Sequence, residues 1–434
     1  MRGLLIVGIL AFYAPILSAQ QSVAEVEAHK HLGVASCASS VCHGQTKTPK
    51  DAKVQMNEFA LWQEFDPHAK SYDVLLNASS KAIASKLGIG PAENAKICLD
   101  CHTDNAPAAM RGEQFQIDDG VGCEACHGGA ENWIASHTKG SHADNLAAGL
   151  FPTEDPVKRA ELCQSCHAGT KDRMITHRIM GAGHPRLSFE LDTFTWLHPH
   201  YTVDADYETR KGRFDGVRDW GVGQGQAAVN LIDILLDKKV GWHGIFPELV
   251  LFDCHACHRP MSGKKWGPRQ GTGLGPGVVR LNDSNLVMFR HVLAAVDSNG
   301  AKRVLDQTRA LHHATTESLA ATDTAARNLR QTVTGLLPAV GQKNFGVETL
   351  GTILGSIVAD ADRGEFRDYA NAEQAAMAAQ SLVVAFENAG LLDEAATNRL
   401  RARSDAVLDA VANDENYTMA QFVEALKALR AAAP

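Results

Sequence analysis

The sequence has no cysteine outside five short motifs, no excess of basic residues and, beyond its first nineteen residues, no long apolar run. Its formal net charge of −8 argues against nucleic-acid binding, which calls for a basic stripe. The glycine-rich stretch 271–277 is followed by no Gly-Lys-Ser/Thr, which excludes a phosphate-binding loop. No later segment is apolar enough to cross a membrane, since a spanning helix needs about 20 such residues.

All ten cysteines fall in motifs that end in a histidine directly after the second cysteine. Four motifs have the form Cys-x-x-Cys-His, and the first has a four-residue spacer. This spacing is typical of haem c attachment, in which two thiols bond to the porphyrin and the histidine binds the iron. We therefore predict five covalently attached haem c groups. The thiols would be Cys37 and Cys42, Cys98 and Cys101, Cys123 and Cys126, Cys163 and Cys166, and Cys254 and Cys257, and the proximal ligands His43, His102, His127, His167 and His258.

Two other uses of paired cysteines were weighed. Paired knuckles can bind zinc, but zinc does not require a histidine directly after each second cysteine. Five disulfides would also leave the histidines unexplained, and two-residue spacers give strained, redox-active disulfides. Haem attachment accounts for both residue types.

The N-terminal segment 1–19 has the pattern of a secretory signal peptide. Arg2 gives a positive start, an apolar run extends from Leu4 to Leu17, and Ser18 and Ala19 suit cleavage after a small residue. Export to the periplasm agrees with haem c, which is attached outside the cytoplasm. The alternative is an uncleaved anchor, which would be the protein's one contact with a membrane.

The rest of the chain is predicted to be mainly α, and its composition divides it into two regions joined by a linker. Residues 20–262 hold all the cysteines and are rich in glycine, proline and histidine, which suggests an irregular multihaem cytochrome c domain with few helices, one of them over about 224–236. Residues 263–282 are predicted to be a glycine-rich linker. Residues 283–434 have helical periodicity, as at Leu350, Ile353, Leu354 and Ile357, and predict a bundle of four to six helices.

A six-coordinate haem iron also needs a second axial ligand. Histidine is the usual choice, and the chain has 19. The candidates are His68, His137, His184 and His200, with His177 also near the motifs. We expect the three histidines of the helical region to be structural, namely His291, His312 and His313.

The stretch from Cys37 to His167 resembles the cytochrome c-554 family, tetrahaem electron carriers of ammonia oxidisers. Four features carry the resemblance in order: a haem motif followed by Trp62 and His68-Ala-Lys, then Cys98-Leu-Asp-Cys101-His102, then the Gly120–Gly128 string around Cys123-Glu-Ala-Cys126-His127, then Cys163-Gln-Ser-Cys166-His167. The resemblance implies electron transfer. It also implies that His68 serves the third haem, His137 the first and His200 the fourth, and that the second haem has no second protein ligand.

The chain departs from the family in its first spacer and in the fifth motif, Cys254–His258. His184 is the first candidate for the fifth haem's second ligand and His177 the next. The resemblance covers less than half of the chain, and residues 263–434 have no counterpart in the tetrahaem carriers.

Three functions remain open. The leading prediction is a periplasmic carrier that passes electrons between redox proteins of respiratory metabolism. One alternative is an oxidoreductase acting on a small nitrogen or sulfur compound at an open iron, most plausibly the second, although the chain lacks the Cys-x-x-Cys-Lys motif of ammonia-forming nitrite reductases. The other is a structural subunit of a larger redox complex, in which the helical region would form the oligomer contact.

Overall fold

The computed structural model describes residues 19–47, 54–242, 247–258, 269–275 and 277–434. The expected signal peptide, except for its last residue, and positions 263–268 and 276 of the expected linker lie outside these ranges. The described residues form helices and no strand, which confirms a mainly α fold. None of their helices is both long and apolar enough to cross a membrane.

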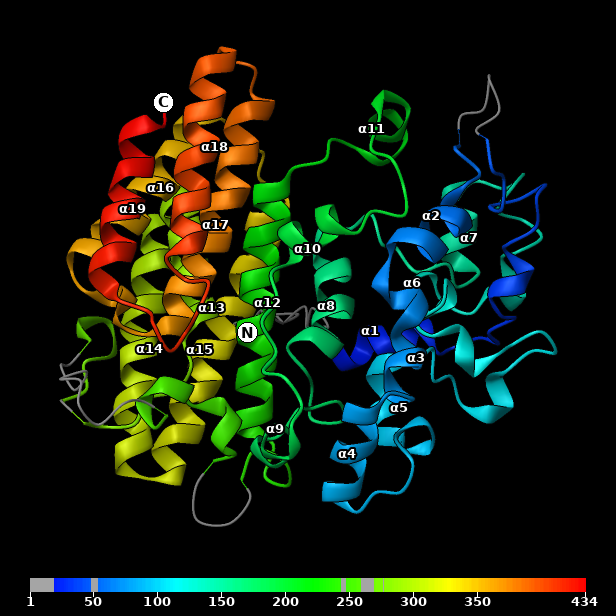
Figure 1. Cartoon of the computed structure of the whole chain (residues 1–434), viewed down its shortest axis with the longest axis horizontal. Coiled ribbons are helices and arrows are strands. Elements are labelled where there is room, and N and C mark those ends of the chain that lie inside the picture. The colour runs from blue at the N-terminus through cyan, green and yellow to red at the C-terminus, as the bar shows by residue number, and fades with distance from the viewer. Residues whose placement is uncertain (1–18, 48–53, 243–246, 259–268, 276) are drawn as a thin grey trace, which may run out of the picture.

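The N-terminal part of the chain folds as short helices joined by turns (Figure 1). Its helices are α1 (Ala19–Val26), α2 (Glu58–Phe65), α3 (Ser71–Leu75), α4 (Ala78–Leu87), α5 (Lys96–His102), α6 (Glu124–His127), α7 (His142–Ala147), α8 (Pro156–His167), α9 (His177–Ala182), α10 (Leu191–Leu197) and α11 (Ala205–Lys211). Buried apolar side chains form only small clusters here, such as Leu75 with Ala84, Ala92 and Leu99. A protein core this small leaves room for macrocycles to supply the apolar contacts.

Helix α12 (Gly216–Leu236) lies between this part and the C-terminal helices (Figure 1). It begins eight residues before the helix expected over 224–236, because Asp215 caps it by accepting a hydrogen bond from the Arg218 backbone N–H. The first turns of α12 contain the glycines Gly221, Gly223 and Gly225, which do not indicate a helix in the sequence. Those glycines permit close packing: a Cβ at Gly225 would lie 2.6 Å from Leu337 of α15. A helix buried on nearly all sides, as α12 is, belongs to the core of a large fold.

The C-terminal region forms a bundle with one large apolar core, to which α12 also contributes. Its helices are α13 (Ser284–Val296), α14 (Ser298–Glu317), α15 (Leu319–Gly341), α16 (Val347–Asp362), α17 (Tyr369–Asn388), α18 (Glu394–Asp409) and α19 (Met419–Ala432). The predicted face of Leu350, Ile353, Leu354 and Ile357 is buried. The expected four to six helices were too few, because single capping residues, Asp297 and Ser318, separate long helices that a hydrophobic pattern reads as continuous.

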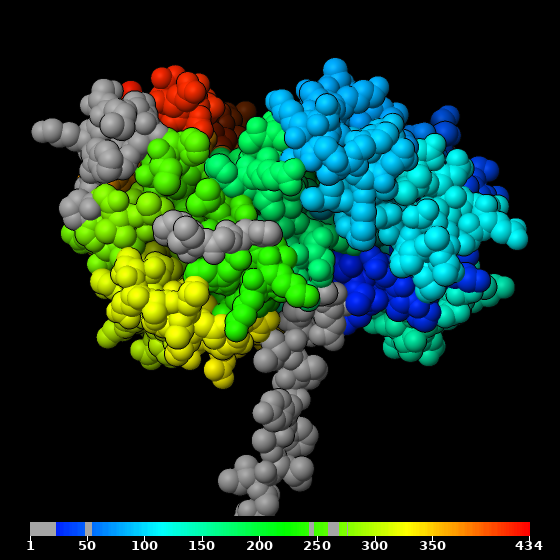
Figure 2. All heavy atoms as spheres, turned by 90° about the horizontal axis from the view of Figure 1, so that it is seen from below, coloured from blue at the N-terminus to red at the C-terminus, as the bar shows by residue number. Residues whose placement is uncertain are grey.

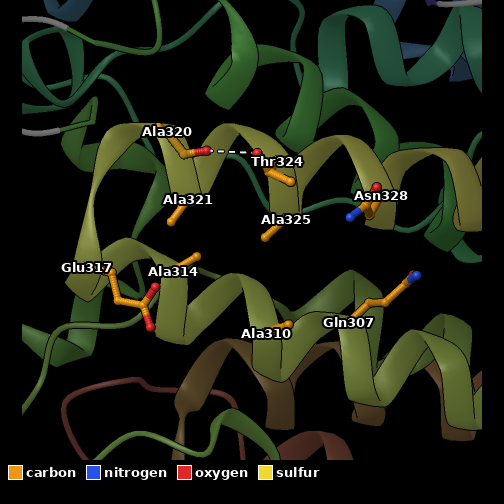
Figure 3. Close-up of a pocket in the computed structure, with 9 residues that line it drawn as sticks. All are labelled: Gln307, Ala310, Ala314, Glu317, Ala320, Ala321, Thr324, Ala325 and Asn328. Carbon is orange, nitrogen blue, oxygen red and sulfur yellow. Dashed lines mark hydrogen bonds between the residues drawn. The ribbon is translucent and has the colours of Figure 1, made fainter.

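Figure 2 shows the early residues, in blue and cyan, packed against residues drawn in green, with the yellow residues of the bundle farther away. A shallow pocket of about 520 Å³ lies between α14 and α15, where alanines such as Ala310, Ala314 and Ala321 face it (Figure 3). No cysteine or histidine lines this pocket, so it is separate from the predicted haem chemistry.

The glycine-rich segment is held to the bundle by a buried arginine, Arg269, at the start of its described part 269–275. Arg269 is 1% exposed in its side chain and pairs with Asp283, with Glu365 at 3.2 Å and with Asp368 at 3.0 Å. Burial raises the pKa of Asp283, but the Arg269 guanidinium outweighs it and holds that pKa well below its usual range. The arginine thus compensates the charge of buried carboxylates that come from three separate positions of the chain.

Replacing this arginine by a neutral residue of similar length should destabilise the bundle. We expect Arg269→Met to cost about 3–5 kcal/mol, because removing one partner leaves buried charge uncompensated. Urea unfolding of the full holoprotein, followed by helical circular dichroism, should show a lower midpoint. The control is Arg327→Met, which removes an exposed pair with Asp323 and should change little. An unchanged midpoint in Arg269→Met would contradict this account.

Candidate haem sites

The second to fifth cysteine motifs lie on helices or a 3-10 turn, and the first begins at the C-cap of the 3-10 turn Val34–Ser36. The second lies on α5, the third at α6, the fourth at the end of α8 and the fifth on the 3-10 turn Cys254–Ala256. Residues three and four apart share one face of a helix, so two cysteines and the following histidine converge. All ten cysteines lie in the described residues and none forms a disulfide. No group of side chains in the described ranges could hold a metal ion by itself.

Four of the five proximal imidazoles have a second histidine ring opposite them. The ring-centroid distances and interplanar angles are 6.3 Å and 21° for His43 with His137, 6.0 Å and 74° for His68 with His167, 6.5 Å and 80° for His102 with His184, and 6.0 Å and 30° for His177 with His258. An imidazole nitrogen binds a metal at about 2 Å, so two rings on opposite sides of one ion have centroids about 6 Å apart. The four pairs therefore fit bis-histidine iron.

Five of these imidazoles, and that of His200, have an acceptor at Nδ1, which leaves Nε2 for a metal. The partners are Glu58 for His43 (2.9 Å), Asp66 for His68 (2.9 Å) and His200 (3.3 Å), and backbone carbonyls for His102 (Ser71, 3.0 Å), His137 (Ile134, 2.7 Å) and His184 (Pro185, 2.7 Å). Such a bond fixes the tautomer and orients the ring of a metal-binding histidine. In these histidines Nδ1 is thus engaged by the protein, and Nε2 is the nitrogen that would bind iron.

Histidines outside the ring pairs use their nitrogens differently. His31, 1% exposed, contacts Asp104 through Nδ1 at 2.8 Å and the Val26 carbonyl through Nε2 at 3.0 Å. In the bundle, Nε2 of His291 lies 3.2 Å from Asp360 and that of His312 lies 3.2 Å from Asp283. The sequence suggested a structural role for His291, His312 and His313, and the first two of these contact buried carboxylates of the bundle.

Neutral imidazole is favoured at two proximal positions. Desolvation lowers the pKa of His127 to about 4 and that of His167 to about 4. The charge of His200 is the next cause at His127, so His200 lies near the third motif. A neutral ring keeps the lone pair that a metal ligand needs.

The ring pairs differ from those that the family resemblance implies. His137 faces the first motif, as expected. His68, however, faces His167 of the fourth motif and not the third, and His200 lies near the third. His184 faces His102 of the second motif, for which no partner was expected, and His177 faces the fifth. The reason is α9, which carries His177 at its start and ends just before His184, so one short helix serves two motifs.

The motifs also meet one another through their thiols. A hydrogen bond from Cys123 lowers the pKa of Cys37, and one with Cys101 lowers that of Cys166 to about 5. The first motif therefore lies beside the third, and the second beside the fourth. In a haem-loaded chain these sulfurs are thioethers and do not titrate.

The string Gly120–Gly128 has a local physical explanation. Gly120 has φ of +76°, and a Cβ there would lie 2.5 Å from the His68 carbonyl oxygen. Glu124 is buried, and its carboxylate accepts backbone N–H groups of Leu32 (2.8 Å), Gly33 (2.7 Å) and Ala130 (2.7 Å). The string thus packs the third motif against the N-terminal segment and against the backbone of His68.

The fifth motif is held by the bundle. Arg280 binds Asp253, which precedes Cys254, at 3.1 Å and also pairs with Asp368 of the bundle. The ring of His255 lies 5.2 Å from that of Tyr369 at the start of α17. The ring of His255 therefore packs on the bundle.

The interplanar angles predict two kinds of low-spin ferric signal. Parallel imidazoles donate into one iron d orbital and separate the orbital energies, whereas perpendicular rings leave them nearly equal. Electron paramagnetic resonance of the oxidised holoprotein should therefore show rhombic signals from the 21° and 30° pairs and large-gmax signals from the 74° and 80° pairs. A spectrum with rhombic signals alone would contradict these ring orientations.

Comparison with known proteins agrees with this chemistry. Residues 36–128, which contain the first three motifs, match the profile of the family described as cytochrome c554 and c-prime. No curated protein and no solved structure matches the chain significantly. Over residues 36–128 the chain is similar to cytochrome c554 and c-prime, and this match, together with the cysteine motifs and opposed imidazoles, supports a haem electron-transfer protein of the multihaem cytochrome c type with covalently bound haem c.

Proposed function

We propose that the protein is an exported electron carrier with five haem c groups, each held between two histidines. One observation carries the proposal: even the second motif, where the family resemblance implied an open iron, has His184 opposite His102 at 6.5 Å. An iron bound by two imidazoles has no free position for a substrate. The third site would be completed by His200 opposite His127.

The motifs follow one another in space in an order that differs from the sequence. Thiol contacts join the first to the third and the second to the fourth. Asp66 contacts both His68 and His200, and thereby links the fourth site to the third. Helix α9 links the second site to the fifth through His184 and His177. The order is first, third, fourth, second, fifth, which supports a single path for electrons.

The protein's own contribution is to bind, orient and tune. Haem c, when bound, supplies a reversible one-electron couple at each site. The Nδ1 acceptors hold each imidazole in one tautomer, and desolvation keeps His127 and His167 neutral. Carboxylate or carbonyl partners adjust how strongly each imidazole donates to iron. None of these roles requires a substrate.

The proposed setting is the periplasm, and the proposed partners are other redox proteins. The segment 1–19 supports export as a signal peptide. The net charge of −8, before any haem propionates, favours docking to a basic patch on a partner. Respiratory nitrogen or sulfur metabolism is the context that the family resemblance suggests.

Removing His184 tests the carrier proposal directly. We expect the wild-type ferric protein to be low-spin and not to bind cyanide, and His184→Ala to gain one high-spin signal that cyanide converts to low-spin. The matched control is His313→Ala, since His313 is an exposed residue of α14 in the bundle and its loss should leave the spectrum unchanged. Cyanide binding to the wild type, or a His184→Ala spectrum like that of the wild type, would overturn the proposal.

The haem count is a separate prediction. Pyridine haemochrome analysis should give five haems per chain, and a Cys254→Ser, Cys257→Ser double variant should give four. A wild-type value of four would mean that one motif, most simply the long-spaced Cys37–His43, carries no haem. The double variant should keep the low-spin signals of the other sites, because Cys254 and Cys257 belong to the fifth motif alone, and that motif packs on the bundle.

A further inference from the structure

Asp66 lies between two histidines that come from distant parts of the sequence. It follows α2, caps the 3-10 turn Pro67–Lys70 by accepting the His68 backbone N–H at 3.0 Å, and is only 6% exposed. Its Oδ1 also accepts from His68 Nδ1 at 2.9 Å. Its Oδ2 lies 3.3 Å from His200 Nδ1. One carboxylate thus meets two imidazoles, one with each oxygen.

These two imidazoles belong to different haem sites. The His68 ring faces His167 of the fourth motif at 6.0 Å. His200 is the ligand proposed above for the third motif, whose His127 has no partner among the four ring pairs. The contacts of Asp66 therefore reach the ligands of two irons at once.

We propose that Asp66 is a positioning residue shared by the third and fourth haem sites, where it orients both distal imidazoles and lowers both reduction potentials together. The proposal rests on the bis-histidine ligation proposed above. It adds that one side chain sets two potentials, so that neither site can be tuned through Asp66 without the other.

The physical basis is the charge of the acceptor. A carboxylate that accepts the Nδ1–H makes the imidazole a stronger donor and stabilises the ferric ion more than the ferrous ion. The effect is large where the anion is shielded from water, as Asp66 is.

The other sites offer an internal comparison. Glu58 accepts from His43 of the first motif at 2.9 Å and touches one iron ligand. At the second motif both rings bind neutral carbonyls, of Ser71 and Pro185. We therefore expect the second haem to have a higher potential than the third and fourth.

The test is a potentiometric titration of the full holoprotein in two variants. Asp66→Asn has nearly the same shape but no charge, and its amide nitrogen cannot accept from a ring N–H. We expect two of the haem midpoints to rise in Asp66→Asn and one to rise in the matched control Glu58→Gln. A variant of Asp66 with full haem content and low-spin iron, in which fewer than two midpoints move, would overturn the proposal.

A second measurement uses the wild type and does not depend on how the variant folds. Redox-difference infrared spectra of protein labelled with ¹³C at aspartate carboxyls should contain a carboxylate band that changes during the reduction of two haems. A set of labelled bands that each follow one haem at most would overturn the proposal. The spin state of the same sample separates the two hypotheses, because high-spin iron would contradict the bis-histidine sites and not the sharing of Asp66.

Discussion

The structure depends on one constraint. A histidine can bind iron through only one ring nitrogen, and the N–H of its other nitrogen needs a hydrogen-bond acceptor within the protein. Nδ1 of His43, His68 and His102 therefore lies within hydrogen-bonding distance of a carboxylate or carbonyl oxygen. The centroid of each ring lies about 6 Å from that of a second histidine ring. Ser71 shows how tightly the backbone is used: its carbonyl accepts from His102 Nδ1, and its hydroxyl donates to the carbonyl of His68 or of His102. Short helices and turns suit this task, because each ligand needs its own direction.

The C-terminal bundle gains a role from the same constraint. The fifth motif has no family counterpart to support it, and its neighbours are Arg280 and the bundle residues Asp368 and Tyr369. Helix α12, packed on α8 and on the bundle, joins the two parts into one core. In the proposed five-haem arrangement, the bundle supports the fifth motif, and α9 lies between that motif and the second.

The sequence was informative where chemistry is local and weak where it is not. Spacing alone identifies Cys98, Cys101 and His102 as a unit, and periodicity finds the buried face of α16. The pairing of distal histidines could not be found this way, because His68 and His167 meet across about a hundred residues of chain. The ring contacts place His68 beside His167 of the fourth motif and His184 beside His102 of the second, whereas the family resemblance implies the third motif for His68 and no partner for the second. The signal that was missed is α9, where two histidines flank a short capped helix and can serve two neighbouring sites.

The central claim is that each iron in the protein lies between two histidines. Near-infrared magnetic circular dichroism of the oxidised holoprotein tests this most directly, because the charge-transfer band of ferric haem reports the identity of its axial ligands. The account predicts bis-histidine intensity equal to five haems per chain, one for each cysteine motif. Intensity equal to four, with a high-spin or histidine–water band from the fifth, would contradict it.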